Sequence, residues 1–204
     1  MMPILETSTM GLILWAAIGY GLGSIPFGMV LARLMGLGNL RDIGSGNIGA
    51  TNVLRTGNKL AAVLTLLLDG AKGAVAVLLA RQFAGHDAVQ IAALGAFIGH
   101  CYPVWLGFRG GKGVSTFLGI WLALAWPVGL ACCATWLAAA ALSRTSSMAA
   151  LAAAAFSTMW AVFLWYGSVF FLGIILTVLV FWRHRANIKR IRAGTEPRIG
   201  QKSQ

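Results

Sequence analysis

The sequence predicts an all-α membrane protein, a polytopic bundle of about seven transmembrane helices that forms one domain over residues 1–204. Of its residues 58% are hydrophobic and 10% are charged, and the mean hydropathy is +0.79. A soluble domain carries about a quarter charged residues. The apolar residues form continuous runs rather than alternating with polar ones, which favours helices over a β-barrel. Sixteen Lys and Arg oppose five Asp and Glu, and most of them fall between the apolar runs.

The first three predicted spans cover residues 10–33, 60–81 and 88–105. The first contains GSIPFG (Gly23–Gly28), so we expect a kink there, formed either by an opened helix or by close helix packing. The second carries Asp69 and Lys72, which lie three residues apart and therefore on one helical face. Because charges inside a membrane are costly, we expect these two to pair and stabilise the bundle, with a contact to substrate as the alternative.

Two longer apolar runs follow, and each exceeds one span of roughly 20 residues. Breaks at Pro127 and at Tyr166-Gly167 divide them into spans 114–126, 127–142, 148–165 and 167–182. The connection 143–147 then joins the fifth and sixth spans. With seven spans and the N-terminus outside, nearly all basic residues and the C-terminus fall on the cytoplasmic side, Arg81 being the exception outside the spans.

Three polar clusters share this predicted cytoplasmic face. They read GSGNIGATNVLR at 44–55, GFRGGKGVST at 107–116 and RHRANIKRIR at 183–192. Glycine allows consecutive backbone N–H groups to turn toward one anion, and hydroxyl, amide and guanidinium groups add further donors. We therefore expect the three clusters to hold phosphate together. The alternative is that each is an ordinary glycine-rich or basic connection.

Several kinds of site are disfavoured by the sequence. The GGKG loop lacks the first glycine of a Walker A motif, because Leu106 stands in its place. Asp42 and Asp87 are predicted on opposite faces and Glu6 and Glu196 lie in the tails, so no two-metal site is expected. No Gly-x-Ser-x-Gly elbow is present, and the three cysteines suggest no disulfide framework. We expect no metal, no cofactor and no nucleic-acid partner, and a site that acts by positioning and charge stabilisation.

Five strings carry a family resemblance that runs in order over nearly the whole chain. They are GSIPFG, GSGNIGATNVLR, DGAKGA (69–74), GHCYPVWLGFRGGKGVST and RHRANIKRIRAGTEPRIG. Together they resemble the bacterial acyl-phosphate:glycerol-3-phosphate acyltransferase family. The resemblance implies a seven-span inner-membrane enzyme that transfers a fatty acyl group from acyl phosphate to the sn-1 hydroxyl of glycerol 3-phosphate. The products would be lysophosphatidate and phosphate, in the first acylation of phospholipid synthesis. We expect a monomer among membrane lipids, with its active site facing the cytoplasm.

The resemblance also implies the site residues, motif by motif. The expected substrate contacts are Ser45, Asn47, Thr51, Arg55, His100, Gly110, Gly111, Lys112, Gly113, Ser146, Ser147 and Asn187. Arg55 and Lys112 would neutralise the two phosphates and, with His184 and Asn187, form the catalytic set. The proton of the attacking hydroxyl would pass to a substrate phosphate, or to His184 or His100.

Alternatives remain at this point. Ser147 fits the serine expected after the fifth span, with Ser146 as the second choice. For His100, the alternative to a substrate contact is a purely structural hydrogen-bonding role. A transporter or flippase of an organic phosphate would also suit a broken first helix and basic loops. A non-catalytic membrane scaffold would leave the glycine-rich loops without a purpose.

Overall fold

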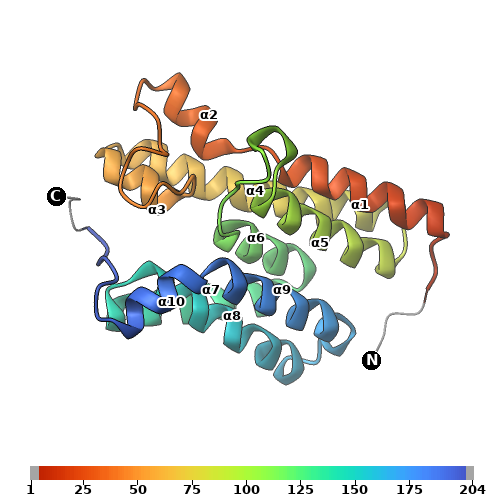
Figure 1. Cartoon of the computed structure of the whole chain (residues 1–204). Coiled ribbons are helices and arrows are strands. Elements are labelled where there is room, and N and C mark those ends of the chain that lie inside the picture. Colours follow the sequence, from red (N-terminus) through yellow and green to blue (C-terminus); the bar gives the residue numbers. More distant parts are fainter. Residues whose placement is uncertain (1–4, 201–204) are drawn as a thin grey trace.

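The computed structural model describes residues 5–200, and in that range every regular element is a helix (Figure 1). The α-helices are α1 (Thr9–Gly23), α2 (Phe27–Leu34), α3 (Ala50–Val53), α4 (Lys59–Phe83), α5 (His86–Cys101), α6 (Val114–Leu124), α7 (Trp126–Ser143), α8 (Ser146–Phe163), α9 (Phe170–Arg183) and α10 (Arg185–Arg192). Three short 3-10 helices are η1 (Leu54–Thr56), η2 (Val104–Leu106) and η3 (Gly167–Val169).

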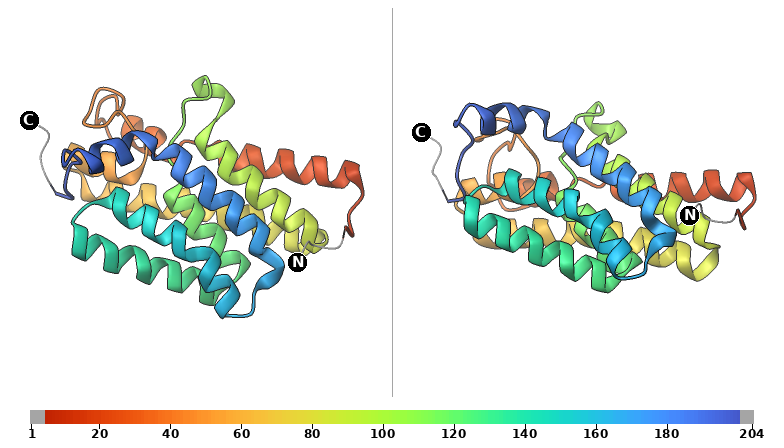
Figure 2. Two further views of the ribbon diagram at one scale, coloured as in Figure 1. Left: turned by 60° about the horizontal axis from the view of Figure 1, so that its bottom comes forward. Right: turned by 90° about the horizontal axis from the view of Figure 1, so that it is seen from below.

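The long helices form one bundle with α6 at its centre. Helix α1 packs along α5, α4 packs against both α5 and α6, and α7 lies between α6 and α8, which in turn packs on α9. The three views show α2, α3 and α10 gathered at one end of this bundle (Figures 1 and 2). The buried core is rich in alanine, with Phe97, Phe117 and Trp121 filling the space around α6. Lipid offers no hydrophobic drive for helices to associate, so membrane helices are held together largely by close packing. Small residues such as alanine allow that close approach.

Five helical segments are long and apolar enough to cross a membrane: Thr9–Leu34, Lys59–Phe83, His86–Leu106, Trp126–Ser143 and Ser146–Phe163. A sixth would be Gly167–Arg183 with Arg185–Arg192, a pair bent by 61°. Helix α6 has only 11 residues, and at 1.5 Å per residue it reaches about half of the ~30 Å hydrocarbon layer. A helix therefore occupies each of the seven predicted positions, while five or six have the length and composition of a full span.

The predicted kink in the first span is confirmed. Helix α1 ends at Gly23 and α2 begins at Phe27, with Pro26 between them. The backbone groups freed there are bonded rather than left open: Trp105 Nε1 donates to the Ser24 carbonyl at 2.8 Å, and Lys72 Nζ donates to the Ile25 carbonyl at 2.7 Å. Such pairing is needed because an unsatisfied polar group in lipid surroundings costs several kcal/mol.

The predicted pairing of Asp69 with Lys72 is also confirmed. Their side-chain atoms Oδ1 and Nζ lie 2.7 Å apart, and each side chain is 2% exposed. Both residues sit in the middle of α4, so the ion pair is buried inside the bundle and does not face lipid.

Two predicted boundaries were wrong by a few residues. The break in the fourth apolar run lies at Ala125, and Pro127 sits in the first turn of α7, where its missing N–H has no helical partner to lose. The connection predicted over 143–147 is shorter, because α8 already begins at Ser146. Ser146 and Ser147 therefore belong to the first turn of a helix and not to a loop.

Close packing of α1 on α5 should make Gly23 intolerant of a side chain. A Cβ atom at Gly23 would collide with the backbone of Ala96, whereas a Cβ atom at Gly21, on the same helix, would meet nothing within 4 Å. We expect Gly23→Ala to lower the free energy of unfolding by about 1–3 kcal/mol through overpacking, and Gly21→Ala to leave it unchanged or raise it. Thermal unfolding in detergent micelles measures both. Equal midpoints for the two variants would contradict this helix contact.

Candidate functional site

The first cluster is organised around a buried amide, Asn52. Its Nδ2 donates to the carbonyls of Leu40 at 2.9 Å and Asn47 at 2.7 Å, and its Oδ1 accepts from the backbone N–H of Ser45 at 3.1 Å. The Ser45 hydroxyl also donates to Oδ1, at 3.2 Å. The Asn52 side chain thus makes four hydrogen bonds that hold the loop in its conformation. Asn52 was not among the predicted site residues, although it lies inside the predicted motif.

Gly44 lets this loop close against the predicted phosphate ligand Arg55. Its φ of +54° lies in the left-handed region, which glycine adopts without steric cost. A Cβ atom there would stand 2.5 Å from Arg55 Nη1 and 2.6 Å from its Cδ. The Arg55 side chain therefore lies flat over the glycine backbone, and a larger residue at position 44 would displace the guanidinium.

The glycine loop of the second cluster is held through both its N–H groups and its carbonyl groups. The N–H groups of Gly110 and Gly111 donate to the carbonyls of Cys101 and His100, both at 3.1 Å. Arg183 donates from Nε and Nη2 to the Gly111 carbonyl and from Nη2 to the Gly110 carbonyl, over 2.9–3.1 Å. Its guanidinium also stacks 4.8 Å from the Tyr102 ring centroid. These contacts fix the loop as it leads into α6.

Helix α6 begins directly after this loop with an uncapped N-terminus. Gly113 is its N-cap, has a φ of +80°, and no side chain caps the helix. The first N–H groups of a helix have no intrahelical partner and carry a partial positive charge. Lys112 precedes them immediately. A helix N-terminus after a glycine-rich loop is a favourable anion site, and here a lysine stands beside it.

The third cluster supplies two buried polar side chains. His184, between α9 and α10, is 2% exposed, and its Nδ1 lies 2.8 Å from the Val180 carbonyl. That bond assigns the proton to Nδ1 and leaves Nε2 as the acceptor. Asn187, on α10, is 4% exposed, and its Nδ2 donates to Glu196 Oε1 at 2.6 Å. Its own Oδ1 is buried without a partner among the described residues.

Glu196, which the sequence placed in the C-terminal tail, contacts the third cluster and α8. Its Oε1 accepts from Ser147 Oγ at 2.7 Å and from Asn187 Nδ2, and its Oε2 accepts from Arg190 Nε at 2.7 Å. The side chain is only 9% exposed. Although burial raises the pKa of Glu196, the hydrogen bonds from Asn187, Ser147 and Arg190 outweigh it, so the pKa lies below its usual value. The carboxylate is therefore ionised and ties α8 to the tail that follows α10.

Two arginines join the three clusters at one end of the bundle. Arg41 donates from Nη1 to the Gly46 carbonyl at 3.2 Å and from Nη2 to the Arg109 carbonyl, linking the first cluster to the second. Arg183 links the second to the third through the glycine carbonyls described above. Figures 1 and 2 place α10 at the same end of the bundle as the loop that precedes α3. The clusters that are far apart in sequence thus form one surface.

Positive charge is concentrated on this surface. Burial lowers the pKa of Lys112 to about 8; Glu196 opposes this shift, while Arg190, Arg55 and Arg183 add to it. These effects place Lys112 within electrostatic reach of cations from the first and third clusters. An anion bound among them would relieve the repulsion.

The predicted site residues differ in how far their side chains are exposed to solvent at this surface. Ser45 and Thr51 are exposed, and Arg55 and Lys112 are partly buried. His100 lies behind the glycine loop: it is 4% exposed, and a Cβ atom at Gly111 would collide with its Nε2. Ser147 is buried against Glu196, whereas Ser146 is partly exposed. The arrangement separates groups that can meet a ligand from groups that support the loop.

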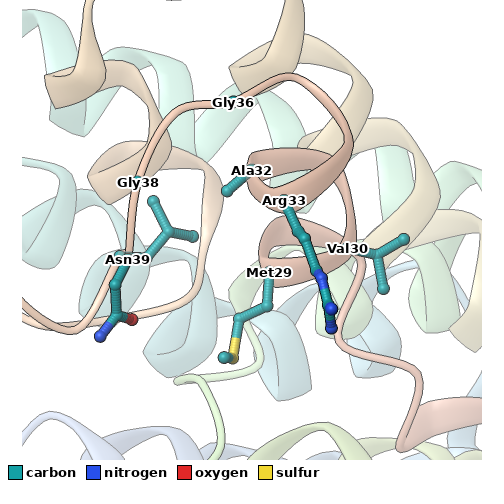
Figure 3. A pocket seen from close by; sticks show the side chains of 8 residues that line it. Met29, Val30, Ala32, Arg33, Gly36, Gly38 and Asn39 are labelled. Carbon is teal, nitrogen blue, oxygen red and sulfur yellow. The ribbon is translucent and has the colours of Figure 1, made fainter.

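A hollow of about 500 Å³ lies next to this surface, between α2 and the loop that follows it (Figure 3). Met29, Val30, Ala32 and Leu40 form apolar walls, and the Arg33 side chain extends along it. None of the predicted site residues lines it. The groups that the sequence predicts to bind phosphate therefore lie outside the hollow.

The chain is similar throughout its length to known proteins. A family model described as glycerol-3-phosphate acyltransferase matches residues 13–194. Relatives of that name include one from Ruegeria pomeroyi, 73% identical over 202 residues, with 99% of this chain and all of the relative covered. One from Cereibacter sphaeroides is 63% identical over 202 residues, with 99% and 96% covered. A crystal structure of PlsY, an integral membrane glycerol 3-phosphate acyltransferase in its glycerol 3-phosphate form, has a TM-score of 0.87 and 38% identity, with 93% of this chain and 96% of PlsY covered. A lysophosphatidic acid form has a TM-score of 0.84 and 36% identity, covering 93% and 95%.

Removing the charge of Glu196 should destabilise the site end of the bundle. A hydrogen bond to a charged group contributes about 1.5–3 kcal/mol, and Glu196 accepts three of them. We expect Glu196→Gln to lower the free energy of unfolding at pH 7 by about 2 kcal/mol or more. Because the folded-state pKa is depressed, the difference should shrink as the pH falls below about 4.5, the ordinary pKa.

A matched control for this measurement is Asp42→Asn. Asp42 is an exposed carboxylate that accepts a hydrogen bond from Asn39 Nδ2 at 2.9 Å. Its loss should change stability by about 0.5 kcal/mol or less. Chemical or thermal unfolding in detergent would show the contrast, and equal effects of the two changes would refute a structural role for Glu196.

Proposed function

Because the chain belongs to the glycerol-3-phosphate acyltransferase family, we propose that it transfers a fatty acyl group from acyl phosphate to the sn-1 hydroxyl of glycerol 3-phosphate. The products are lysophosphatidate and inorganic phosphate, and the reaction is the first acylation of phospholipid synthesis. One observation carries the proposal: Lys112 stands beside an uncapped helix N-terminus, in a cluster of cations contributed by three separate segments. Such a site suits reactants that are both phosphates.

The two phosphates would divide among the clusters. Lys112, the glycine loop and the first turn of α6 bind the phosphate of the donor, and Arg55 binds that of glycerol 3-phosphate. The Asn187 side chain, whose Oδ1 has no partner among residues 5–200, meets the glycerol hydroxyls. Ser45, Asn47 and Thr51 complete the acceptor side. Holding both reactants in this way supplies the effective concentration and charge neutralisation that the reaction needs.

The chemistry then needs little from the protein beyond this placement. The sn-1 oxygen attacks the acyl carbonyl carbon, the bond from that carbon to the phosphate oxygen breaks, and phosphate leaves. The hydroxyl proton passes to a phosphate oxygen of a substrate, with His184 Nε2 as the alternative acceptor. Glu196 is unsuited to that role, because its oxygens already accept hydrogen bonds from Ser147, Asn187 and Arg190.

The same proposal includes the setting of the enzyme. We place it in the bacterial inner membrane as a monomer and a single domain, with seven spans, the N-terminus outside, and the C-terminus and active site in the cytoplasm. In support, the basic side chains of all three clusters gather at one end of the bundle, as the positive-inside rule expects for a cytoplasmic face. Helix α6 and the bent α9–α10 pair are the two segments whose crossing needs a direct test.

The proposed reaction is tested with the purified enzyme in detergent or nanodiscs. Acyl phosphate, acyl-CoA and acyl carrier protein are compared as donors, and phosphate release is measured with and without glycerol 3-phosphate. We expect lysophosphatidate only with acyl phosphate, and phosphate release that depends on glycerol 3-phosphate. Turnover with acyl-CoA alone would refute the donor, and vesicle uptake of glycerol 3-phosphate without acyl transfer would favour a transporter.

Substitution of single lysines tests whether the reaction takes place at the cluster of cations around Lys112. Lys112→Ala should lower kcat/KM about 100-fold or more, as expected for loss of a charge that stabilises the leaving phosphate. Lys189→Ala removes the same charge from an exposed position on α10 and should retain activity within about twofold. Equal activities of the two variants would remove Lys112 from the mechanism.

The pH dependence should report the depressed pKa of Lys112. Because this pKa is about 8 rather than 10.5, the free enzyme loses the positive charge as the pH rises through 8. We expect kcat/KM to fall above that pH, by up to tenfold for each further unit. Lys112→Arg keeps its charge and should shift the fall to higher pH. A profile that is flat from pH 7 to 9.5 in the wild type would contradict the assignment.

A further inference from the structure

The buried ion pair of α4 makes more contacts than pairing alone requires. Asp69 Oδ1 and Lys72 Nζ lie 2.7 Å apart, and Lys72 Nζ also donates to the Ile25 carbonyl in the α1–α2 break. A buried pair is often no more stabilising than well-packed apolar residues, because both charges lose their hydration. An intramembrane pair with several further partners is therefore a candidate for a functional role.

The first further partner is His100, which connects the pair to the glycine loop. His100 Nδ1 lies 3.7 Å from Asp69 Oδ1 and has no hydrogen-bond partner among the described residues. The Nε2 side of the ring packs against Gly111 so closely that no Cβ atom would fit there. The His100 carbonyl accepts the N–H of Gly111 at 3.1 Å. The imidazole thus fills the space between the charged pair and the loop that carries Lys112.

The second further partner is the first turn of α6. Thr116 Oγ1 donates to the Asp69 carbonyl at 2.8 Å, and Thr116 is fully buried. About one turn further along each helix, a Cβ atom at Gly73 on α4 would collide with Thr116, and one at Gly119 on α6 would collide with the Gly70 backbone. The α4 turn that carries the ion pair is therefore in backbone contact with α6 just below its N-terminus, where the anion site begins.

We propose that Asp69 and Lys72 are positioning residues for the donor-phosphate site, acting through His100 and Thr116 on the glycine loop and the α6 N-terminus. This inference rests on the proposed function, in that it assigns the donor phosphate to that loop. The charged side chains contact the α1–α2 break and the end of α5, and the backbone carbonyl of Asp69 accepts the bond from the start of α6. Loss of the charges shifts the loop relative to Arg55, and a shift of about 1 Å costs about 100-fold in rate.

The test compares stability with kinetics in the full-length enzyme. Asp69→Asn leaves Lys72 buried without its partner and should lower both stability and kcat. The double variant Asp69→Asn/Lys72→Met removes both charges with little change in volume, so stability should return close to the wild-type value. We expect its kcat with acyl phosphate to remain about 10- to 100-fold low, while the KM for glycerol 3-phosphate changes less than threefold.

A control separates positioning from general stability. Val128→Ala removes two methyl groups from a fully buried position on α7, at the end of the bundle away from the loops. It should lower the unfolding midpoint while leaving kcat unchanged below that midpoint. The proposal is overturned if the double variant recovers wild-type kcat together with its stability, or if kcat follows the unfolding midpoint across all variants, Val128→Ala included. If the wild-type enzyme uses another donor, the proposed function fails, and the same comparison with that donor still decides the role of the pair.

Discussion

The site depends on one structural constraint, the close contact of α4 with the beginning of α6. Helix α6 has only 11 residues. Its depth and its rotation in the bundle are therefore set by its contacts with neighbouring helices. Glycine at 70, 73 and 119 lets the two backbones meet, and the Thr116 hydroxyl bonds to the Asp69 carbonyl at their crossing. The uncapped start of α6, next to Lys112, is thereby held in a fixed place, which is the condition for electrostatic preorganisation at the proposed anion site.

Collecting this much positive charge has a cost, and the structure shows how it is offset. Arg183 uses its guanidinium on two glycine carbonyls and a tyrosine ring, and Arg41 uses its own on the carbonyls of Gly46 and Arg109. These arginines satisfy carbonyl groups of the loops, while the N–H groups at the start of α6 have no side-chain cap. Glu196 supplies the one carboxylate held against the third cluster among the residues described, and it counteracts the lowered pKa of Lys112.

Local patterns predicted the parts of the site that depend on neighbours in sequence. The i, i+3 spacing of Asp69 and Lys72 was enough to predict their pairing, and the glycines with Pro26 were enough to predict the break in the first helix. The family resemblance in the motifs was confirmed by the comparisons. Glu196 and Arg183 could not be assigned in this way. Glu196 bonds to Ser147, 49 residues away, and Arg183 bonds to Gly111, 72 residues away. A glutamate near a C-terminus also has no local signature of burial. A signal was nevertheless present, because Glu196 stands within the tail string that carries the family resemblance.

The sequence by itself determined the helical membrane architecture, the chemistry of the three clusters and the family. These follow from composition, from residue type and from spacing within a few turns of helix, where geometry is set by the backbone alone. Only the tertiary structure decided that His100 lies behind the glycine loop, that α6 has only 11 residues, and that Glu196 in the tail bonds to Ser147 and Asn187. The physical reason is that burial and hydrogen bonding between distant segments depend on how helices pack, and packing is the sum of many contacts that no single stretch of sequence contains.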